Sequence, residues 1–70
     1  MRIWVNGLHR EISTDFVYYV DIFYIVTDRT PNRGEVMTIS YRGENSAGEL
    51  TDGGGPVDLE EGMTFTAFVA

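Results

Sequence analysis

The chain has 70 residues, enough for one domain with one hydrophobic core, and its 43% hydrophobic and 13% aromatic content is typical of a folded protein. It contains no cysteine, which excludes disulfides, thiolate metal sites and a cysteine nucleophile and indicates a reducing, cytoplasmic compartment. The net charge of −6 disfavours nucleic-acid binding and suits a partner with a basic groove. The sequence shows neither a signal peptide nor an apolar run long enough to cross a membrane.

The first predicted element is a β-hairpin. Residues 1–5, MRIWV, alternate between an apolar side and a side that carries Trp4, which is the periodicity of a strand. Asn6-Gly7 follows and is a strong hairpin signal, because both central residues of a type I′ turn need a positive φ. The return strand is expected over Leu8–Ser13.

A two-residue loop fixes the pairing of this hairpin. It sets the unlike charges of Arg2 and Glu11 opposite each other, but it places Arg10 on the apolar side beside Ile3, an awkward position for a charge. A β-bulge near the turn is an alternative that would shift the register. The expected pairs are Val5–Leu8, Trp4–His9, Arg2–Glu11 and Met1–Ile12.

The longest apolar run, Phe16–Asp28, is expected to hold the helix of the domain. The turn and cap residues 13–15 precede it, and a period of 3.6 residues begins near Tyr18. The β-branched content makes a strand the alternative, and residues 16–17 can belong to an extended segment before the helix. The helix buries Tyr19, Ile22, Phe23 and Val26, places Asp21 and Asp28 roughly opposite, and leaves Val17, Tyr24 and Ile25 near the surface.

Alternating segments follow the helix. Val36–Arg42 is predicted as a strand with Met37, Ile39 and Tyr41 on the core side, and Met63–Ala70 as the closing strand. The closing strand turns Met63, Phe65, Ala67 and Val69 to one side. Two short segments precede it: Glu49–Thr51 is a very short strand, and Val57–Leu59 is a short strand or a single turn. Loops are expected at residues 29–34, 43–48, 52–56 and 60–62.

The predicted order is hairpin, helix, strand, short strand, strand. One helix on one face of a mixed sheet is an α+β arrangement, and we expect a single domain over residues 1–70. Closing the sheet in this order sets the first and last strands side by side and parallel at its centre. This arrangement is the β-grasp, or ubiquitin roll.

The opening MRIWVNGLH resembles the first strand and turn of ubiquitin. Three later stretches resemble the bacterial multi-ubiquitin domain family: YVDI at 19–22, a tyrosine-containing strand ending in Arg-Gly at 37–43, and EGMTF at 61–65. Glu49-Leu50 and Val57 fit the same pattern. The resemblance covers nearly the whole chain and is loosest over residues 14–18 and 29–35.

This resemblance implies a small protein modifier rather than an enzyme. Such domains resemble the substrates of bacterial conjugation pathways, in which an activating enzyme adenylates the C-terminus and a carrier protein, sometimes with a processing peptidase, acts beside it. The chemistry belongs to those enzymes, so no cofactor is expected here. Ala70 is the expected attachment end, but a conjugated ubiquitin-like protein usually ends in glycine after a flexible tail. Three explanations fit an end at Ala70 without such a tail. The chain is truncated, it is one repeat of a tandem precursor, or it is never conjugated.

We expect the binding surface on the sheet face away from the helix. Trp4 and Phe68 fall on that face, and because the first and last strands are neighbours the two rings can come close. Thr66, on the closing strand, is assigned to the same surface. Arg42 is a polar rim or an ordinary solvated arginine. The alternative is that these aromatic rings are covered by a longer parent chain or by self-association.

Other residues carry weaker signals. His9 is alone and is expected to be a surface histidine rather than a metal ligand. Adjacent Glu60 and Glu61 point apart on a tight turn, which argues against general acid–base catalysis. Residues 53–55 form a flexible glycine linker without the features of a phosphate-binding loop. All five basic residues are arginines, so no side-chain amine is available as an isopeptide acceptor.

Overall fold

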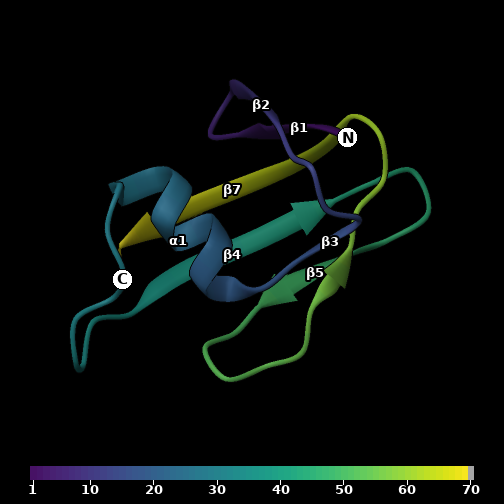
Figure 1. Cartoon of the computed structure of the whole chain (residues 1–70). Coiled ribbons are helices and arrows are strands. Elements are labelled where there is room, and N and C mark those ends of the chain that lie inside the picture. The colour runs from purple at the N-terminus through teal and green to yellow at the C-terminus, as the bar shows by residue number, and fades with distance from the viewer. Residues whose placement is uncertain (70) are drawn as a thin grey trace.

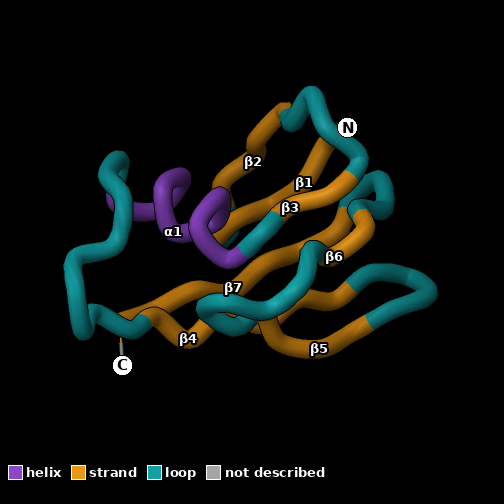
Figure 2. Tube along the Cα trace, turned by 60° about the horizontal axis from the view of Figure 1, so that its bottom comes forward, coloured by secondary structure: helices purple, strands orange, loops and turns teal. Residues whose placement is uncertain are grey.

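A computed structural model describes residues 1–69, and in this part of the chain one helix crosses one face of a five-stranded sheet (Figures 1 and 2). The sheet has the order β2-β1-β7-β4-β5, with β1 and β7 parallel and the other pairs antiparallel. The elements are β1 (Arg2–Val5), β2 (Leu8–Glu11), β3 (Phe16–Val17), α1 (Tyr19–Thr27), β4 (Met37–Arg42), β5 (Ala47–Leu50), β6 (Val57–Asp58) and β7 (Met63–Val69).

The N-terminal hairpin has the predicted register. Asn6 and Gly7 take φ values of 51° and 80°, the two positive values that a tight I′ turn needs. The pairs run from Val5–Leu8 to Arg2–Glu11 without a bulge, and two backbone hydrogen bonds of 2.6 and 2.7 Å continue the ladder to Met1–Ile12. Arg10 does lie opposite Ile3, but β2 is an edge strand whose four residues are all exposed, so the guanidinium reaches water.

Asn6 also extends the central parallel ladder beyond the end of β1. Its backbone N–H donates to the carbonyl of Phe65, and its side-chain amide donates to the carbonyl of Ala67 and accepts from the Ala67 N–H at 2.9 and 2.8 Å. The side chain therefore takes the place of another strand residue beside β7. Only its role in the turn was predicted from the sequence.

Helix α1 begins directly after Tyr18, whose N–H donates to the Asp21 carboxylate at 2.8 Å, a first-turn acidic group that also suits the helix dipole. It ends at Asp28, which adopts a left-handed conformation and donates its N–H to the Tyr24 carbonyl. The predicted helix is therefore confirmed, and the strand alternative is excluded for residues 19–27.

Three burial predictions for this segment need correction. Val26 is 37% exposed, because it borders a small open hollow between the end of α1 and the β1–β2 hairpin, where Leu8 and Arg10 line the other side without covering it. Val17 is buried rather than near the surface, because it belongs to β3, which pairs with β6 and turns the side chain inward. Ile25 is half-buried against the core.

The core lies between α1 and the inner face of the sheet. The hydroxyl of buried Tyr19 accepts a 2.8 Å hydrogen bond from the N–H of Met37 and so ties the helix to the start of β4. Val69, predicted on the core side, is exposed, because β1 ends opposite Phe65 and leaves this end of β7 with one neighbouring strand. The buried residues are Ile3, Val5, Val17, Tyr19, Ile22, Phe23, Met37, Ile39, Leu50, Leu59, Met63, Phe65 and Ala67.

Candidate protein-binding surfaces

The outer sheet face, the side of the five-stranded sheet away from α1, carries the residues predicted to bind a partner. Trp4 lies opposite Thr64 on β7, and Thr64 lies opposite Arg42 on β4, so these three form one row across the sheet. Thr66 is the next outward residue along β7. Trp4, Thr66 and Arg42 are therefore brought onto one continuous face, and all are exposed.

Trp4 is the aromatic centre of this face. Its side chain is 41% exposed and packs edge-on against His9, its cross-strand partner, with ring centroids 5.4 Å apart. The other face of β1 is fully buried at Ile3 and Val5, so alternation along the strand is what directs the indole outward. His9 is thus a stacking partner of Trp4 on an edge strand.

Phe68 does not join Trp4. It is 56% exposed and pairs with Thr38 near the end of β7, four residues beyond Thr64. Four residues of strand correspond to about 13 Å, and Thr66 occupies the outward position between Thr64, the residue opposite Trp4, and Phe68. The parallel register therefore separates the two rings, although their strands are neighbours.

A shallow polar hollow of about 510 Å³ adjoins this row on β4, β5 and β7. Its side chains are small or polar, and Arg42 is the cation at its border; within residues 1–69 Arg42 forms no salt bridge. The hydroxyl of Thr64 donates to the Arg42 carbonyl at 3.3 Å. The outward lining residues are Ser40, Arg42, Ala47, Glu49, Thr64 and Thr66.

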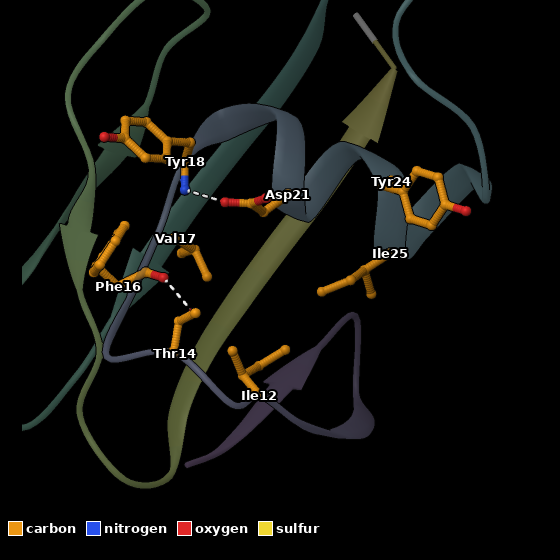
Figure 3. Close-up of a pocket in the computed structure, with 8 residues that line it drawn as sticks. All are labelled: Ile12, Thr14, Phe16, Val17, Tyr18, Asp21, Tyr24 and Ile25. Carbon is orange, nitrogen blue, oxygen red and sulfur yellow. Dashed lines mark hydrogen bonds between the residues drawn. The ribbon is translucent and has the colours of Figure 1, made fainter.

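A second concavity, the apolar groove, lies on the helix side of the molecule (Figure 3). It has a volume of about 480 Å³ and runs between residues 12–18 and α1. The side chains of Ile12, Val17 and Ile25 converge on it from three different segments. The remaining lining residues are Thr14, Phe16, Tyr18, Asp21 and Tyr24. The sequence placed Tyr24 correctly near the surface, but it gave no indication that these residues form one groove.

The strongest carboxylate interactions hold loops and not a reaction centre. Arg29 forms two 2.6 Å hydrogen bonds to Glu35 and lowers the pKa of that carboxyl to about 2. The hydroxyl of Ser46 and the backbone of Asn45 lower the pKa of Glu60 by binding its carboxylate. These contacts close the loop after α1 and the turn between β4 and β5.

The adjacent Glu60 and Glu61 serve different partners, as their divergence on a tight turn predicts. Glu60 binds the β4–β5 turn, whereas Glu61 accepts the N–H of Arg2 at 2.7 Å. Among residues 1–69 no group of three or more His, Asp or Glu side chains could hold a metal ion. No helix in the same range is long and apolar enough to cross a membrane. Ala70, the expected attachment end, lies outside the described residues.

Comparisons with models of protein families, with curated proteins and with solved structures find no match to this chain. The surfaces described above are therefore the basis for a functional proposal, together with the sequence resemblance. Both surfaces expose aromatic side chains, which are enriched in protein interfaces relative to the rest of a protein surface.

Proposed function

We propose that the chain is a β-grasp domain of the ubiquitin-like kind that works by binding other proteins. The observation that carries this proposal is the parallel pairing of β1 with β7 at the centre of a five-stranded sheet whose inner face is covered by one helix. The hairpin, helix and later strands also follow one another in the β-grasp order. A fold alone does not specify a function, so the binding role rests on the exposed row around Trp4.

We further propose that the domain is a protein modifier, the substrate of an activating enzyme and a carrier protein. Its support is the resemblance of YVDI, MTISYRG and EGMTF to the multi-ubiquitin domain family. Val69, the last residue of β7, is exposed, so this end of the strand is accessible to an enzyme. The modifier would contribute its C-terminal carboxylate, and the enzymes would contribute ATP chemistry.

The direct test is activation of the C-terminus. The chain would be incubated with ATP and with the adenylating enzyme and carrier protein of a bacterial ubiquitin-like conjugation system, and intact-mass spectrometry would follow the product. We expect an adenylate or a thioester adduct with the carrier, together with release of pyrophosphate. A chain with an amidated C-terminus is the matched control, because it cannot be adenylated. Equal signals from the acid and the amide would reject the modifier role.

A noncovalent interaction domain is the second candidate. It is favoured by the outer sheet face, where Trp4 is exposed beside His9 and Thr64 and needs no modification of the chain to bind a partner. A chain that binds partner proteins through this face, but that no activating enzyme adenylates, would match this candidate. Binding by wild type and Trp4→Ala, compared at equal thermal stability, tests the face itself.

A further inference from the structure

The apolar groove lies on the helix side of the sheet, whereas Trp4 faces away from the helix, so the proposed function makes no use of the groove. We propose that the groove is a second docking site, which binds a short protein segment carrying an aliphatic or aromatic side chain next to a lysine or arginine. This site is independent of conjugation and of the outer sheet face.

The groove concentrates apolar surface that the fold leaves uncovered. Phe16, Tyr18 and Tyr24 are 42%, 42% and 51% exposed, and Phe16 packs edge-on against Tyr18 with ring centroids 5.9 Å apart. Scattered exposed apolar residues are ordinary, but a contiguous patch with a concave centre is typical of an interaction site. A volume of about 480 Å³ accepts one or two large side chains of a partner.

Hydrogen bonds within the chain fix the strand side of the groove. The Thr14 hydroxyl donates to the Phe16 carbonyl at 2.8 Å, and the Leu59 N–H donates to the Asp15 carbonyl at the same distance. The pairing of β3 with β6 holds Phe16 and Val17 in place. Because this wall exists before a partner arrives, binding does not require its side chains and backbone to be ordered first.

A hydrogen bond within the chain also fixes the helix side of the groove, and this side supplies the negative charge of Asp21. The N–H of Tyr18 binds one carboxylate oxygen of Asp21 at 2.8 Å. Within residues 1–69 the other oxygen of Asp21 and the hydroxyl of Tyr24 make no hydrogen bond, so both can accept one from a partner. An ammonium or guanidinium group beside an apolar anchor matches the free Asp21 oxygen, whereas the Tyr24 hydroxyl points outward at the other end of the groove.

The charges around the groove select a basic partner. Asp21 is the charged residue of the lining; Asp15 precedes Phe16, and Asp58 lies opposite Phe16 in the β3–β6 pair. One arginine, Arg10, lines the neighbouring hollow with Ile25 and Val26. Three carboxylates against one guanidinium, in a chain of net charge −6, give this side a negative potential. A second copy of the chain would bring the same negative charge, which disfavours it as the occupant.

The probe is an acetylated and amidated heptapeptide, KLFKLIK, titrated into the ¹⁵N-labelled chain. We expect amide shift changes concentrated in residues 12–18 and 21–25, with a dissociation constant on the order of 100 μM to 1 mM at low salt, the range of a small transient interface. Raising the salt concentration should weaken binding, because the charged contact is exposed to solvent. The control peptide, ELFELIE, should bind at least roughly tenfold more weakly, since its carboxylates face those of the groove.

Two variants locate the site. Tyr24→Ala removes an exposed wall and should weaken peptide binding at least roughly fivefold with little change in the thermal midpoint. Asp21→Asn keeps an oxygen that accepts the Tyr18 N–H but removes the charge, so it should reduce both the affinity and its salt dependence. Trp4→Ala is the matched aromatic control on the outer sheet face and should leave peptide affinity unchanged.

Three results would overturn the proposal. These are equal binding of the acidic peptide, shift changes centred on the outer sheet face, and shift changes that follow protein concentration without peptide, which would assign the groove to a second copy. None of them bears on adenylation of the C-terminus. A failed adenylation assay would in turn leave the groove untouched, so the two proposals fail separately.

Discussion

The outer sheet face and the apolar groove differ in what builds them. The outer sheet face follows from regular strand pairing, which sets Trp4, Thr64 and Arg42 in one row. The groove is assembled from a two-residue strand, a capped helix and a loop. Single hydrogen bonds hold these parts: the Thr14 hydroxyl donates one to the Phe16 carbonyl, and the Asp21 carboxylate accepts one from the Tyr18 N–H. A regular sheet can lose one outward side chain without changing shape, whereas the shape of the groove depends on each of its contacts.

The largest expected effect is a difference in stability between variants on the two sides of β1. Ile3→Ala should lower the free energy of unfolding by about 2–5 kcal/mol, because Ile3 is fully buried and its truncation leaves a cavity. Trp4→Ala, one residue away, should cost less than about 1 kcal/mol, since the indole faces water, yet it should weaken partner binding. Chemical denaturation of both variants measures the difference. Equal destabilisation would show that Trp4 is structural and would remove the outer sheet face as a binding site.

The next effect compares two tyrosines of α1. Tyr19→Phe should cost about 1–3 kcal/mol, because the buried N–H of Met37 loses its acceptor. Tyr24→Phe, in the wall of the groove, should leave stability unchanged. Thermal unfolding of the pair tests whether the helix is anchored on its inner side alone. An equal loss in Tyr24→Phe would mean that the groove side also holds the helix in place.

A smaller effect on stability is expected at Asn6, whose side chain continues the hydrogen bonding to β7 after the end of β1. Asn6→Gly keeps the positive φ of the turn but removes both side-chain hydrogen bonds to Ala67, and we expect a loss of about 1 kcal/mol. Hydrogen exchange should quicken at the Ala67 amide and stay unchanged at the Thr64 amide. Unchanged protection at Ala67 would show that the side chain does not extend the ladder.

The smallest effect is the pH dependence of the loop after α1. The Glu35 carboxyl in this loop has a pKa of about 2 in the folded chain, against an ordinary 4.5. Ionised Glu35 therefore stabilises the folded chain above about pH 4.5, and this contribution is lost as the pH falls towards 2. The thermal midpoint of Glu35→Gln should therefore lie below that of wild type at neutral pH, and the gap should close in acid. Glu49→Gln serves as the control. A gap that persists at pH 2 would assign the effect to something other than the Arg29–Glu35 pair.

Much of the local structure could be predicted because it depends on near neighbours. The period of two residues predicted β1, β4 and β7, and Asn6-Gly7 fixed the hairpin register through its positive φ values. The period of 3.6 residues placed the helix, and the DGGGP loop separates β5 from β6 as expected. On the outer sheet face, alternation correctly turned Trp4, Thr66 and Arg42 outward.

Errors and omissions occurred where burial depends on distant segments. Val17 and Val26 have the same side chain in one apolar run, but their burial differs. Pairing with β6 turns Val17 inward, whereas Val26 borders an open hollow beside the β1–β2 hairpin. The distance between Trp4 and Phe68 depends on the parallel register of β1 with β7, which no local pattern encodes. The groove was missed for the same reason, since its lining comes from three segments.

The sequence by itself determined the longer strands, the helix, the hairpin and the acidic, lysine-free composition, since these follow from alternation, turn chemistry and residue counts; it missed that β5 begins at Ala47, inside the predicted loop 43–48. The tertiary structure alone decided how far β7 runs beyond β1, how Asn6 bridges that difference, and which apolar side chains stay uncovered. The physical reason is that the pairing of strands some sixty residues apart in the sequence depends on the packing of the whole core. The residues of one strand or helix do not specify where the neighbouring strands end.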